Sequence, residues 1–564
     1  MKQFIFVIIY LIMQTGSEAQ EKEFYTNPIL AGFYPDPSIC RAGNDYYIVN
    51  SSFAYFPGLP IFHSKDLLSW KQIGHAMNRP EQLNTIGAGV SRGLFAPAIS
   101  YHKGIFYIVC TLIDKGGNFV ITATDPAGPW SDPVWLNEVD GIDPSLFFDE
   151  DDKAWIIYNS IPPENKSLWD GHRTIRMRAF DKKELKTFGE EILVVNGGTD
   201  ISKKPVWIEA PHIYKVNDWY YLLCAEGGTG YHHSEVVFRS RSVTGPYIPF
   251  EGNPVLTQRH LDPARPNPVT TAGHADLVET PDGKWYAVFL GCRPYQGNHF
   301  NIGRETFMMP VRWENEWPVI TKGDELVQYQ YPLPQPHISR DGANEFTGNF
   351  IFRDAFSNKP LDHRFIFLRT PMEKWYSTSE KPGGLSMQLR PETVSGKGNP
   401  SFLGFRQQHH EGSATAALDF IPASSNEKAG MVVFQSENHF YFLCKSIEQN
   451  TPVVQLYRST KNEDMELLES KPLNSSNQRV YLRIEPKKDR YLMSWAVDEK
   501  IWNPILEVDA RFLSTETAGG FVGCVIGLYA TSLGKQSHNK AHFKWFEYRG
   551  KDGLISQANG NRLK

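Results

Sequence analysis

The sequence has few cysteines, no cluster of basic residues and no long apolar run. Its six cysteines lie 68 to 152 residues apart along a chain of 564 residues, which fits neither a metal knuckle nor a compact disulfide framework. We therefore expect most of them to be small apolar residues inside strands. A net charge of −5 without basic clusters argues against a nucleic-acid partner.

The apolar run near the N-terminus, Phe4–Met13, has ten residues, far short of the ~20 residues that span a bilayer. Lys2 precedes this run, and Ser17-Glu18-Ala19 supplies small residues at a cleavage point. The pattern predicts a secretory signal peptide over residues 1–19, without membrane insertion. The mature protein is accordingly expected in the periplasm or outside the cell.

Aromatic and turn-forming residues are abundant instead. The chain contains 25 tyrosines, 35 phenylalanines and 14 tryptophans, together 13% of all residues, besides 45 glycines and 38 prolines. Aromatic side chains favour strands, and glycine and proline favour the turns between them. This composition indicates a turn-rich all-β protein rather than a helical bundle or a disordered chain.

A five-fold repeat organises the first 330 residues. Five segments begin alike: Asp36-Pro37-Ser38-Ile39, Ala96-Pro97-Ala98-Ile99, Asp143-Pro144-Ser145-Leu146, Ala210-Pro211-His212-Ile213 and His274-Ala275-Asp276-Leu277. Their starts are 60, 47, 67 and 64 residues apart, and each segment is followed by a polar turn and an aromatic strand. Units of this length, with several short strands each, predict a five-bladed β-propeller.

Propeller geometry predicts which side chains converge. The first strand of each blade lies innermost in such a ring, and its start faces the central channel. Asp36, Phe95, Asp143, Glu209 and His274 stand at or beside the five starts. A single Asp-Pro pair is common in turns, but three carboxylates directed at one axis favour a catalytic site.

The repeat stops near residue 330, which predicts a second domain. The catalytic propeller would occupy residues 20–330, and a proline-containing linker on the surface would occupy residues 331–349. Stretches such as Met431-Val432-Val433-Phe434 lack helical periodicity and predict a β-sandwich over residues 350–552. A polar tail, residues 553–564, would end the chain.

Three carboxylates on one axis suit the hydrolysis of a sugar acetal. A carboxylic acid protonates the departing oxygen while a carboxylate on the opposite face activates water, and at a separation of roughly 6.5–9.5 Å the anomeric configuration inverts. The acid must stay protonated near neutral pH, so its pKa must rise by about two units. A third carboxylate provides such a rise, because like charges in a dry pocket resist ionising together.

Motifs in both predicted domains carry a family resemblance. They are Asn27–Ser38, Gly141–Leu146, Trp207–His212, Gly273–Glu279 and Gly303–Thr306 in the first domain, and Phe365–Pro371 and Ala429–Val433 in the second. With them the chain resembles glycoside hydrolase family 43, the inverting β-xylosidases and α-L-arabinofuranosidases. The resemblance implies a five-bladed propeller, a concanavalin-like sandwich, and an oligosaccharide or polysaccharide substrate.

The resemblance also implies roles for individual residues. Asp36 would be the general base, Glu209 the general acid, and Asp143 the residue that raises the pKa of the acid and orients it. Phe53 and Phe95 would line the pocket for the terminal sugar; many xylosidases of the family carry tryptophan at the position of Phe95.

Three further positions follow from the resemblance. Arg304 would donate hydrogen bonds to sugar hydroxyls, the alternative being a structural ion pair with an acid such as Glu305. His274 would stand at the propeller axis, where relatives use it to hold water or a calcium ion, although the chemistry requires no metal. The loop Thr517–Gly523 of the second domain would close one end of the pocket and favour cutting at chain ends; Thr517 stands where an aromatic side chain is expected.

Three other patterns carry less weight. Gly89-Val90-Ser91-Arg92-Gly93 has the spacing of a serine-hydrolase elbow, but a loop precedes it and a strand rather than a helix is expected after it. Family 32 hydrolases share the two-domain plan, yet their Asn-Asp-Pro-Asn-Gly signature is absent. The pairs His232-His233 and His409-His410 lack metal-ligand spacing and are interpreted as polar surface or rim residues.

The sequence is consistent with more than one sugar substrate. An exo-acting β-1,4-xylosidase, an α-L-arabinofuranosidase and a dual enzyme are all consistent with it, because pocket contacts worth only ~1–3 kcal/mol separate such similar substrates. A non-catalytic, secreted sugar-binding propeller is the hypothesis from another class. The three carboxylates are all intact, which favours the enzyme.

Overall fold

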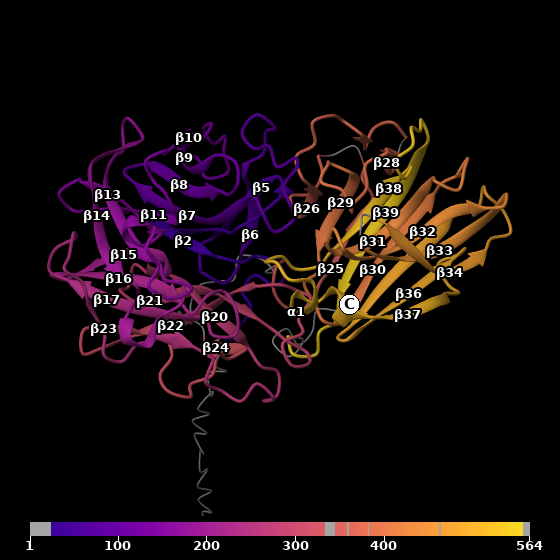
Figure 1. The fold of residues 1–564 in the computed structure, drawn as a ribbon. Helices are drawn as coiled ribbons and strands as arrows, with labels where there is room; N and C mark the ends of the chain where they lie inside the picture. The colour runs from indigo at the N-terminus through magenta and orange to yellow at the C-terminus, as the bar shows by residue number, and fades with distance from the viewer. Residues whose placement is uncertain (1–23, 333–344, 358–359, 382, 462–463, 556–564) are drawn as a thin grey trace, which may run out of the picture.

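The computed structural model describes residues 24–332, 345–357, 360–381, 383–461 and 464–555. Two strand-rich lobes lie side by side, the N-terminal one in indigo to magenta and the C-terminal one in orange to yellow (Figure 1). The prediction of an all-β chain, with a five-bladed propeller followed by a sandwich, is confirmed. The expected signal peptide lies outside the described residues, as does most of the expected polar tail.

Each propeller blade is an antiparallel sheet whose strands run outward from the channel in sequence order. Blade 1 contains β2 (Ser38–Ala42), β3 (Asp45–Val49), β5 (Gly58–Ser64) and β6 (Lys71–Met77). Blade 2 contains β7 (Leu94–His102), β8 (Ile105–Leu112), β9 (Gly117–Ala123) and β10 (Val134–Trp135). Blade 3 contains β11 (Ile142–Phe148), β12 (Ala154–Ser160), β13 (Thr174–Asp181) and β14 (Lys186–Asn196).

The last two blades complete the ring. Blade 4 contains β15 (Glu209–Val216), β16 (Trp219–Glu226), β17 (Ser234–Ser240), β18 (Ile248–Pro249) and β19 (Leu256–Thr257). Blade 5 contains β20 (Thr270–Glu279), β21 (Trp285–Cys292), β22 (Glu305–Glu314) and β23 (Trp317–Val319). The innermost strands β2, β7, β11, β15 and β20 contact one another around the axis, as the repeat predicted.

The two ends of the propeller segment are joined to each other. β1 (Phe24–Thr26) pairs with β24 (Gln330–Pro332), so the first two residues assigned to the linker belong to a strand. The side chain of Asn27 donates to the carbonyl of Met308 and accepts from its N–H, at 2.9 and 3.0 Å. Farther along the expected linker, Phe346 is buried against Tyr34 and Phe62.

The C-terminal lobe consists of two eight-stranded antiparallel sheets that pack against each other. One sheet contains β25 (Ile351–Asp354), β27 (Tyr376–Ser377), β28 (Leu385–Gln388), β30 (Gly412–Asp419), β35 (Val480–Lys487), β36 (Arg490–Ala496), β37 (Asn503–Asp509) and β39 (Lys540–Gly550). The other contains β4 (Tyr55–Phe56), β26 (Phe365–Leu368), β29 (Ser401–Arg406), β31 (Lys428–Ser436), β32 (His439–Glu448), β33 (Thr451–Ser459), β34 (Met465–Pro472) and β38 (Val525–Thr531).

Helices in the described ranges are single turns. They are the 3₁₀ turns η1 (Pro163–Asn165), η2 (Ile201–Lys203) and η3 (Ala510–Leu513), and the α-helix α1 (Thr515–Ala518). None of them has the length and apolar character needed to cross a membrane. All six cysteines are buried and unpaired, which confirms their expected role as small core residues.

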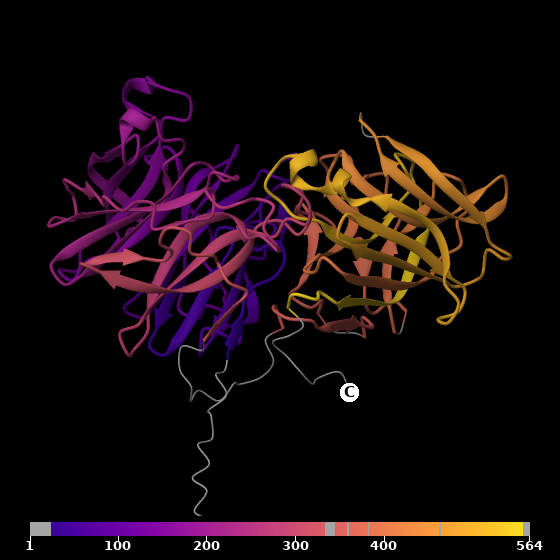
Figure 2. The ribbon, with the colours of Figure 1, turned by 90° about the horizontal axis from the view of Figure 1, so that it is seen from below.

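The lobes share backbone pairing and one apolar core. β4 comes from the propeller segment of the chain, yet it pairs with β26 and forms the edge of a sandwich sheet. A single cluster of buried apolar residues runs from Val49 and Leu94 of the propeller to Leu403 and Phe546 of the sandwich. Figure 2 shows the yellow segment that contains α1 at the junction with the propeller. The sandwich is therefore placed rigidly enough to contribute side chains to a site on the propeller.

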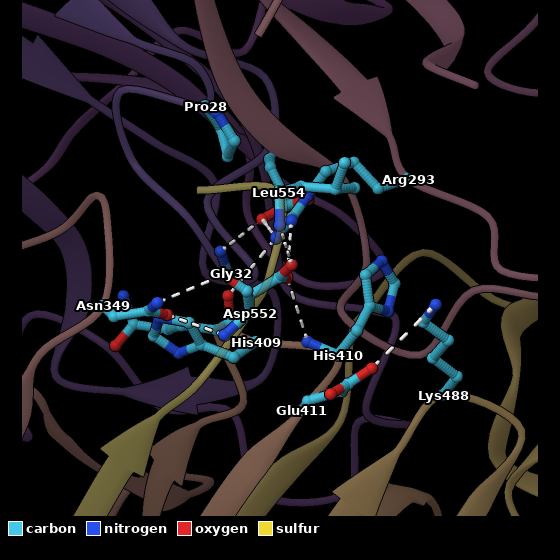
Figure 3. A network of polar contacts seen from close by, with 12 residues as sticks. Pro28, Gly32, Arg293, Asn349, His409, His410, Glu411, Lys488, Asp552 and Leu554 are labelled. Carbon is cyan, nitrogen blue, oxygen red and sulfur yellow. Dashed lines mark hydrogen bonds and ion pairs between the residues drawn. The ribbon is translucent and has the colours of Figure 1, made fainter. Parts of the chain in front are cut away.

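A buried ion network fastens the lobes at a second point (Figure 3). Arg293 forms two hydrogen bonds with Glu305, at 2.5 and 2.9 Å, and pairs across the interface with Asp552 at 3.0 Å. All three side chains are almost inaccessible to solvent. Asn349 exchanges hydrogen bonds with the backbone of Asp552. Burial acts to raise the pKa of Asp552, but Arg293 and the nearby His410 and His409 lower it to about 2.

Replacement of this arginine should destabilise the whole chain. Arg293→Met would leave Glu305 and Asp552 buried without their cation, and such a loss costs about 3–5 kcal/mol of unfolding free energy. Chemical denaturation measures it. Arg479→Met is the matched control, because Arg479 pairs with Asp419 at the solvent-exposed surface and its loss should cost less than about 1 kcal/mol. Equal stability of the two variants would contradict the importance of the network.

Candidate active site

Backbone irregularities at the starts of the innermost strands help to place the site. The ladders of β11, β15 and β20 each shift register near their first residues. Asp143, Ala210 and His274 lie inside these shifts, with left-handed φ angles of 54°, 50° and 57°, and Asp36, just before β2, has φ 50°. A β-bulge re-aims the side chains next to it. The repeated segments at the blade starts therefore also carry the backbone irregularities that direct these side chains.

Asp36 is a buried carboxylate that is held in its ionised form. Its exposed fraction is 4%, its Oδ1 accepts a hydrogen bond from Arg304 at 2.6 Å, and its Oδ2 accepts one from Ser51 at 2.6 Å. Burial alone would raise its pKa, but the Arg304 guanidinium, His274 and the Ser51 hydroxyl hold the pKa below its ordinary value. An ionised carboxylate of this kind can accept a proton from water.

Glu209, in contrast to Asp36, tends to keep its proton. Burial, and then the negative charge of Asp36, raise its pKa to about 7, although Arg304 and Arg173 act in the opposite direction. Burial and the charges of Glu209 and Asp36 also raise the pKa of Asp143 well above its ordinary range. The structure therefore brings together the three predicted carboxyl groups, with one held ionised and the others inclined to keep a proton.

Aromatic rings from both lobes form one wall of the site. Phe53, with its ring centroid 5.4 Å from that of Phe95, also stacks on Phe33 at 5.8 Å. The sandwich adds Phe521, whose ring lies 6.1 Å from Phe53 and 6.0 Å from Phe95. The aromatic side chain sought at position 517 thus stands four residues later, in the same loop. Only the fold shows this, because a loop has no periodicity to fix which residue faces the pocket.

Arg304 joins Asp36 to the sandwich. Besides Asp36 it donates to the Thr229 hydroxyl at 2.9 Å and to the carbonyl of Phe521 at 3.4 Å. The ion pair considered between Arg304 and its neighbour Glu305 is not formed, because Glu305 points to Arg293 instead. The Thr229 and Ser51 contacts were not expected from the sequence, since single hydroxyl residues carry no distinctive signal.

His274 is buried in the same channel, where burial lowers its pKa to about 4 and keeps the ring neutral, although the Asp36 charge opposes this. Calcium prefers oxygen ligands, whereas His274 offers a ring nitrogen. Within the described ranges, no group of three His, Cys, Asp or Glu side chains could hold a metal ion. The side chains around His274 therefore do not fit a calcium cage made by the protein itself.

Two other sequence patterns are resolved by the fold. The Ser91 hydroxyl accepts a hydrogen bond from Phe521 N–H at 2.9 Å, and the strand β7 follows it, so the serine-hydrolase elbow is absent. The interpretation of the histidine pairs as polar surface or rim residues was wrong for three of the four residues. His233, His409 and His410 are buried, since the first lines the propeller interior and the other two lie in the interface of Figure 3.

Comparison with known proteins agrees with this arrangement. The family model for glycosyl hydrolases family 43 matches residues 25–318, and the model for the β-xylosidase C-terminal concanavalin A-like domain matches residues 353–549. A xylosidase/arabinosidase of Butyrivibrio fibrisolvens is 40% identical, over 92% of this chain and 98% of its own length. A non-reducing end α-L-arabinofuranosidase of Bacteroides ovatus is 38% identical, over 97% and 98%.

Solved structures give the same result. A xylan β-1,4-xylosidase of Bacillus halodurans superposes with a TM-score of 0.83 at 31% identity, covering 93% of this chain and all of its own. A Bacteroides ovatus protein described as "Xyloglucan PUL GH43B" gives a TM-score of 0.83 at 36% identity, with 94% and 100% coverage. The chain belongs to glycosyl hydrolase family 43 and is a glycoside hydrolase.

Proposed function

We propose that the protein is an exo-acting hydrolase that releases terminal xylose from xylo-oligosaccharides or xylan side chains. The observation that carries this proposal is the opposite protonation of two carboxyl groups in one buried channel. Asp36 is held ionised by Arg304, whereas Glu209 keeps a proton up to about neutral pH. One base and one acid are what the inverting hydrolysis of a glycoside requires.

In the proposed reaction, Asp36 takes a proton from a water molecule as the water oxygen forms a bond to the anomeric carbon. Glu209 gives its proton to the glycosidic oxygen as the old bond breaks, and the leaving sugar departs as an alcohol. The negative charge of Asp36 supports the protonated state of the acid, Asp143 would orient the acid, and Arg304 orients Asp36. Phe53 and Phe95 would pack against the apolar face of the terminal sugar, with Arg304 donating to its hydroxyls.

Closure of one end of the pocket supports the exo-acting mode. The loop that carries Phe521 is fastened to the propeller through Ser91, and Gly520 lies so close to Ser91 that a Cβ at Gly520 would approach Ser91 Oγ to 2.3 Å. The loop thus joins the two lobes beside Phe53 and Phe95, and a pocket closed there would admit only a chain end.

Release of α-L-arabinofuranose, alone or together with xylose, is the second candidate. The names of the relatives favour it, because the 40% identical protein of Butyrivibrio fibrisolvens is called a xylosidase/arabinosidase and the Bacteroides ovatus protein an α-L-arabinofuranosidase. We further propose that no metal takes part in the reaction, since the three carboxyl groups suffice for the proton transfers and the side chains at His274 do not fit a calcium cage.

Substitution of the acid and the base tests the roles. Glu209→Gln and Asp36→Asn should each lower kcat/KM by about 10²- to 10⁴-fold, because each removes one proton transfer. The assay substrates are nitrophenyl β-D-xyloside, nitrophenyl α-L-arabinofuranoside, and xylo- and arabino-oligosaccharides. Comparison of kcat/KM among them also ranks the two sugars. Glu191→Gln, an acid of the outer strand β14, should stay within twofold. Near-normal turnover by Glu209→Gln or Asp36→Asn on an oligosaccharide would refute the assignment.

The pH dependence of kcat/KM should be asymmetric. Glu209 acts in its protonated form and has a pKa of about 7, so activity should fall about tenfold per pH unit above pH 7. Asp36 acts in its ionised form and its pKa lies below the ordinary value of 3.8, so the loss on the acid side should begin only below about pH 4. A profile that stays level up to pH 9 would show that Glu209 is not the acid.

The stereochemistry of the product tests the mechanism without mutation. Proton NMR of enzyme dialysed against EDTA should show α-xylose as the first product from a β-xyloside, because water attacks the face opposite the leaving group. The rate should match that of undialysed enzyme within twofold. First appearance of β-xylose would exclude inversion, and a rate that is lost with EDTA and restored by calcium would exclude the metal-free proposal.

A further inference from the structure

Trp207 has an unusual backbone conformation next to the proposed acid. It precedes Glu209 by two residues and adopts φ 52°, in the left-handed region that bulky residues rarely occupy. Its N–H donates to the carbonyl of Gly171 at 2.8 Å, and the carbonyl of Val206 accepts from Gly227 at 2.7 Å. Backbone strain of this kind is retained where the surroundings enforce it, commonly at functional sites.

Arg173 lies over the ring of this tryptophan. The centre of its guanidinium is 3.9 Å from the centre of the indole ring, and Nη1 donates to the carbonyl of its neighbour His172. No carboxylate in the described part of the chain forms an ion pair with Arg173. Its charge nevertheless acts on Glu209, since it lowers the pKa of that carboxyl against the larger effect of burial. Because Arg173 lies over Trp207, the guanidinium stands beside the segment that carries Glu209.

The pair has hydrogen-bond donors with no protein partner. Trp207 Nε1 and Arg173 Nε and Nη2 donate to no group among the described residues, and none of them is buried from solvent. Trp169, in the neighbouring loop, differs, because its Nε1 donates to the carbonyl of Pro205 at 2.6 Å. A flat apolar surface bordered by free donors is suited to a sugar, which has both an apolar face and hydroxyl oxygens.

Two loops hold this pair in a fixed position. The loop after β12 and the loop before β15 are joined by the Trp169–Pro205 hydrogen bond and by the Trp207–Gly171 hydrogen bond. Trp169 also stacks on His172 at 4.1 Å, and His172 in turn hydrogen-bonds Asn196 at 2.8 Å. The apolar rim continues on Val206, which is 41% exposed. Such a surface can receive a ligand without rearranging.

The position of Trp207 and Arg173 relative to the carboxyl groups decides which part of the substrate the pair would contact. In the proposed mechanism the acid contacts the glycosidic oxygen, so the sugar beyond that oxygen leaves on the Glu209 side, while Asp36 would act from the opposite face of the terminal sugar. Trp207 and Arg173 adjoin Glu209. The loop next to Trp207, Gly227–Thr229, leads directly to the Thr229–Arg304 hydrogen bond.

We infer that Trp207 and Arg173 form the binding platform for the leaving sugar, the first unit beyond the bond that is cut, and thereby set leaving-group specificity. The inference rests on the proposed function, because it takes Glu209 as the acid. The leaving sugar packs on the Trp207–Arg173 surface, and its hydroxyls accept from the free N–H groups. The ligand class is a neutral pyranose or furanose unit within an oligosaccharide.

Binding to an inactive form separates this platform from catalysis. In the Glu209→Gln background, calorimetry compares xylobiose with xylose, or α-1,5-arabinobiose with arabinose if the wild type cleaves only arabinofuranosides. The disaccharide is expected to bind at least tenfold more tightly than the monosaccharide. Adding Trp207→Ala should reduce this advantage to threefold or less and leave monosaccharide affinity within twofold, whereas Trp207→Phe should retain most of it.

Control variants exclude a general structural effect. Arg483 lies over Trp502 at 3.6 Å in the sandwich, so Trp502→Ala removes a similar stack far from the carboxyl groups and should leave the advantage unchanged. Arg173→Met, in the active enzyme, should raise the pKa of Glu209 and move the alkaline limb of kcat/KM to higher pH, while Arg173→Lys keeps the limb in place.

The outcomes distinguish the two proposals. An unchanged disaccharide advantage in Trp207→Ala, or an equal loss for both sugars, would overturn the platform while wild-type hydrolysis leaves the proposed function intact. Absence of hydrolysis of every substrate by the wild type would overturn both. A selective loss of disaccharide affinity, with the unfolding temperature unchanged, would support the platform.

Discussion

The ion pair between Arg304 and Asp36 determines the chemistry of the whole channel. A carboxylate with an exposed fraction of 4% would ordinarily take up a proton, because burial disfavours its charge. The guanidinium at 2.6 Å keeps it ionised. That retained negative charge then helps to raise the pKa of Glu209, so one ion pair favours opposite protonation states in the two groups that we propose as base and acid.

The sandwich takes part in this electrostatic arrangement. Arg304 also donates to the carbonyl of Phe521, and the Phe521 ring covers Phe53 and Phe95. The position of that loop depends on the interface, where the strand β4 joins a sandwich sheet and Arg293 links Glu305 to Asp552. Buried ion pairs are weak sources of net stability, but loss of one partner is costly, so the network favours a single relative position of the lobes.

Left-handed residues recur where the backbone has to aim a side chain. Asp36, Asp143 and His274 have φ angles between 50° and 57°, and Trp207 has φ 52° two residues before Glu209, the proposed acid. Each such residue costs of order 1–3 kcal/mol and persists because the surrounding strands enforce it. The register shift at the starts of β7, β11, β15 and β20 is thus a repeated device of the fold, and the same strain at Trp207 marks the side from which we propose that the leaving sugar is held.

The sequence by itself determined the blade count and the three carboxyl groups, because the five-fold repeat places Asp36, Asp143 and Glu209 at equivalent strand starts. It also determined the second all-β domain, because the alternation of apolar and polar residues along a strand is a local property of the sequence. Only the tertiary structure decided the partners of these groups. Arg304 pairs with Asp36 rather than with its neighbour Glu305, Phe521 rather than residue 517 faces the pocket, and His409 and His410 are buried in the interface. Each of these contacts joins residues more than one hundred positions apart, or depends on which face of a loop turns inward. Local pattern and composition carry no information on either.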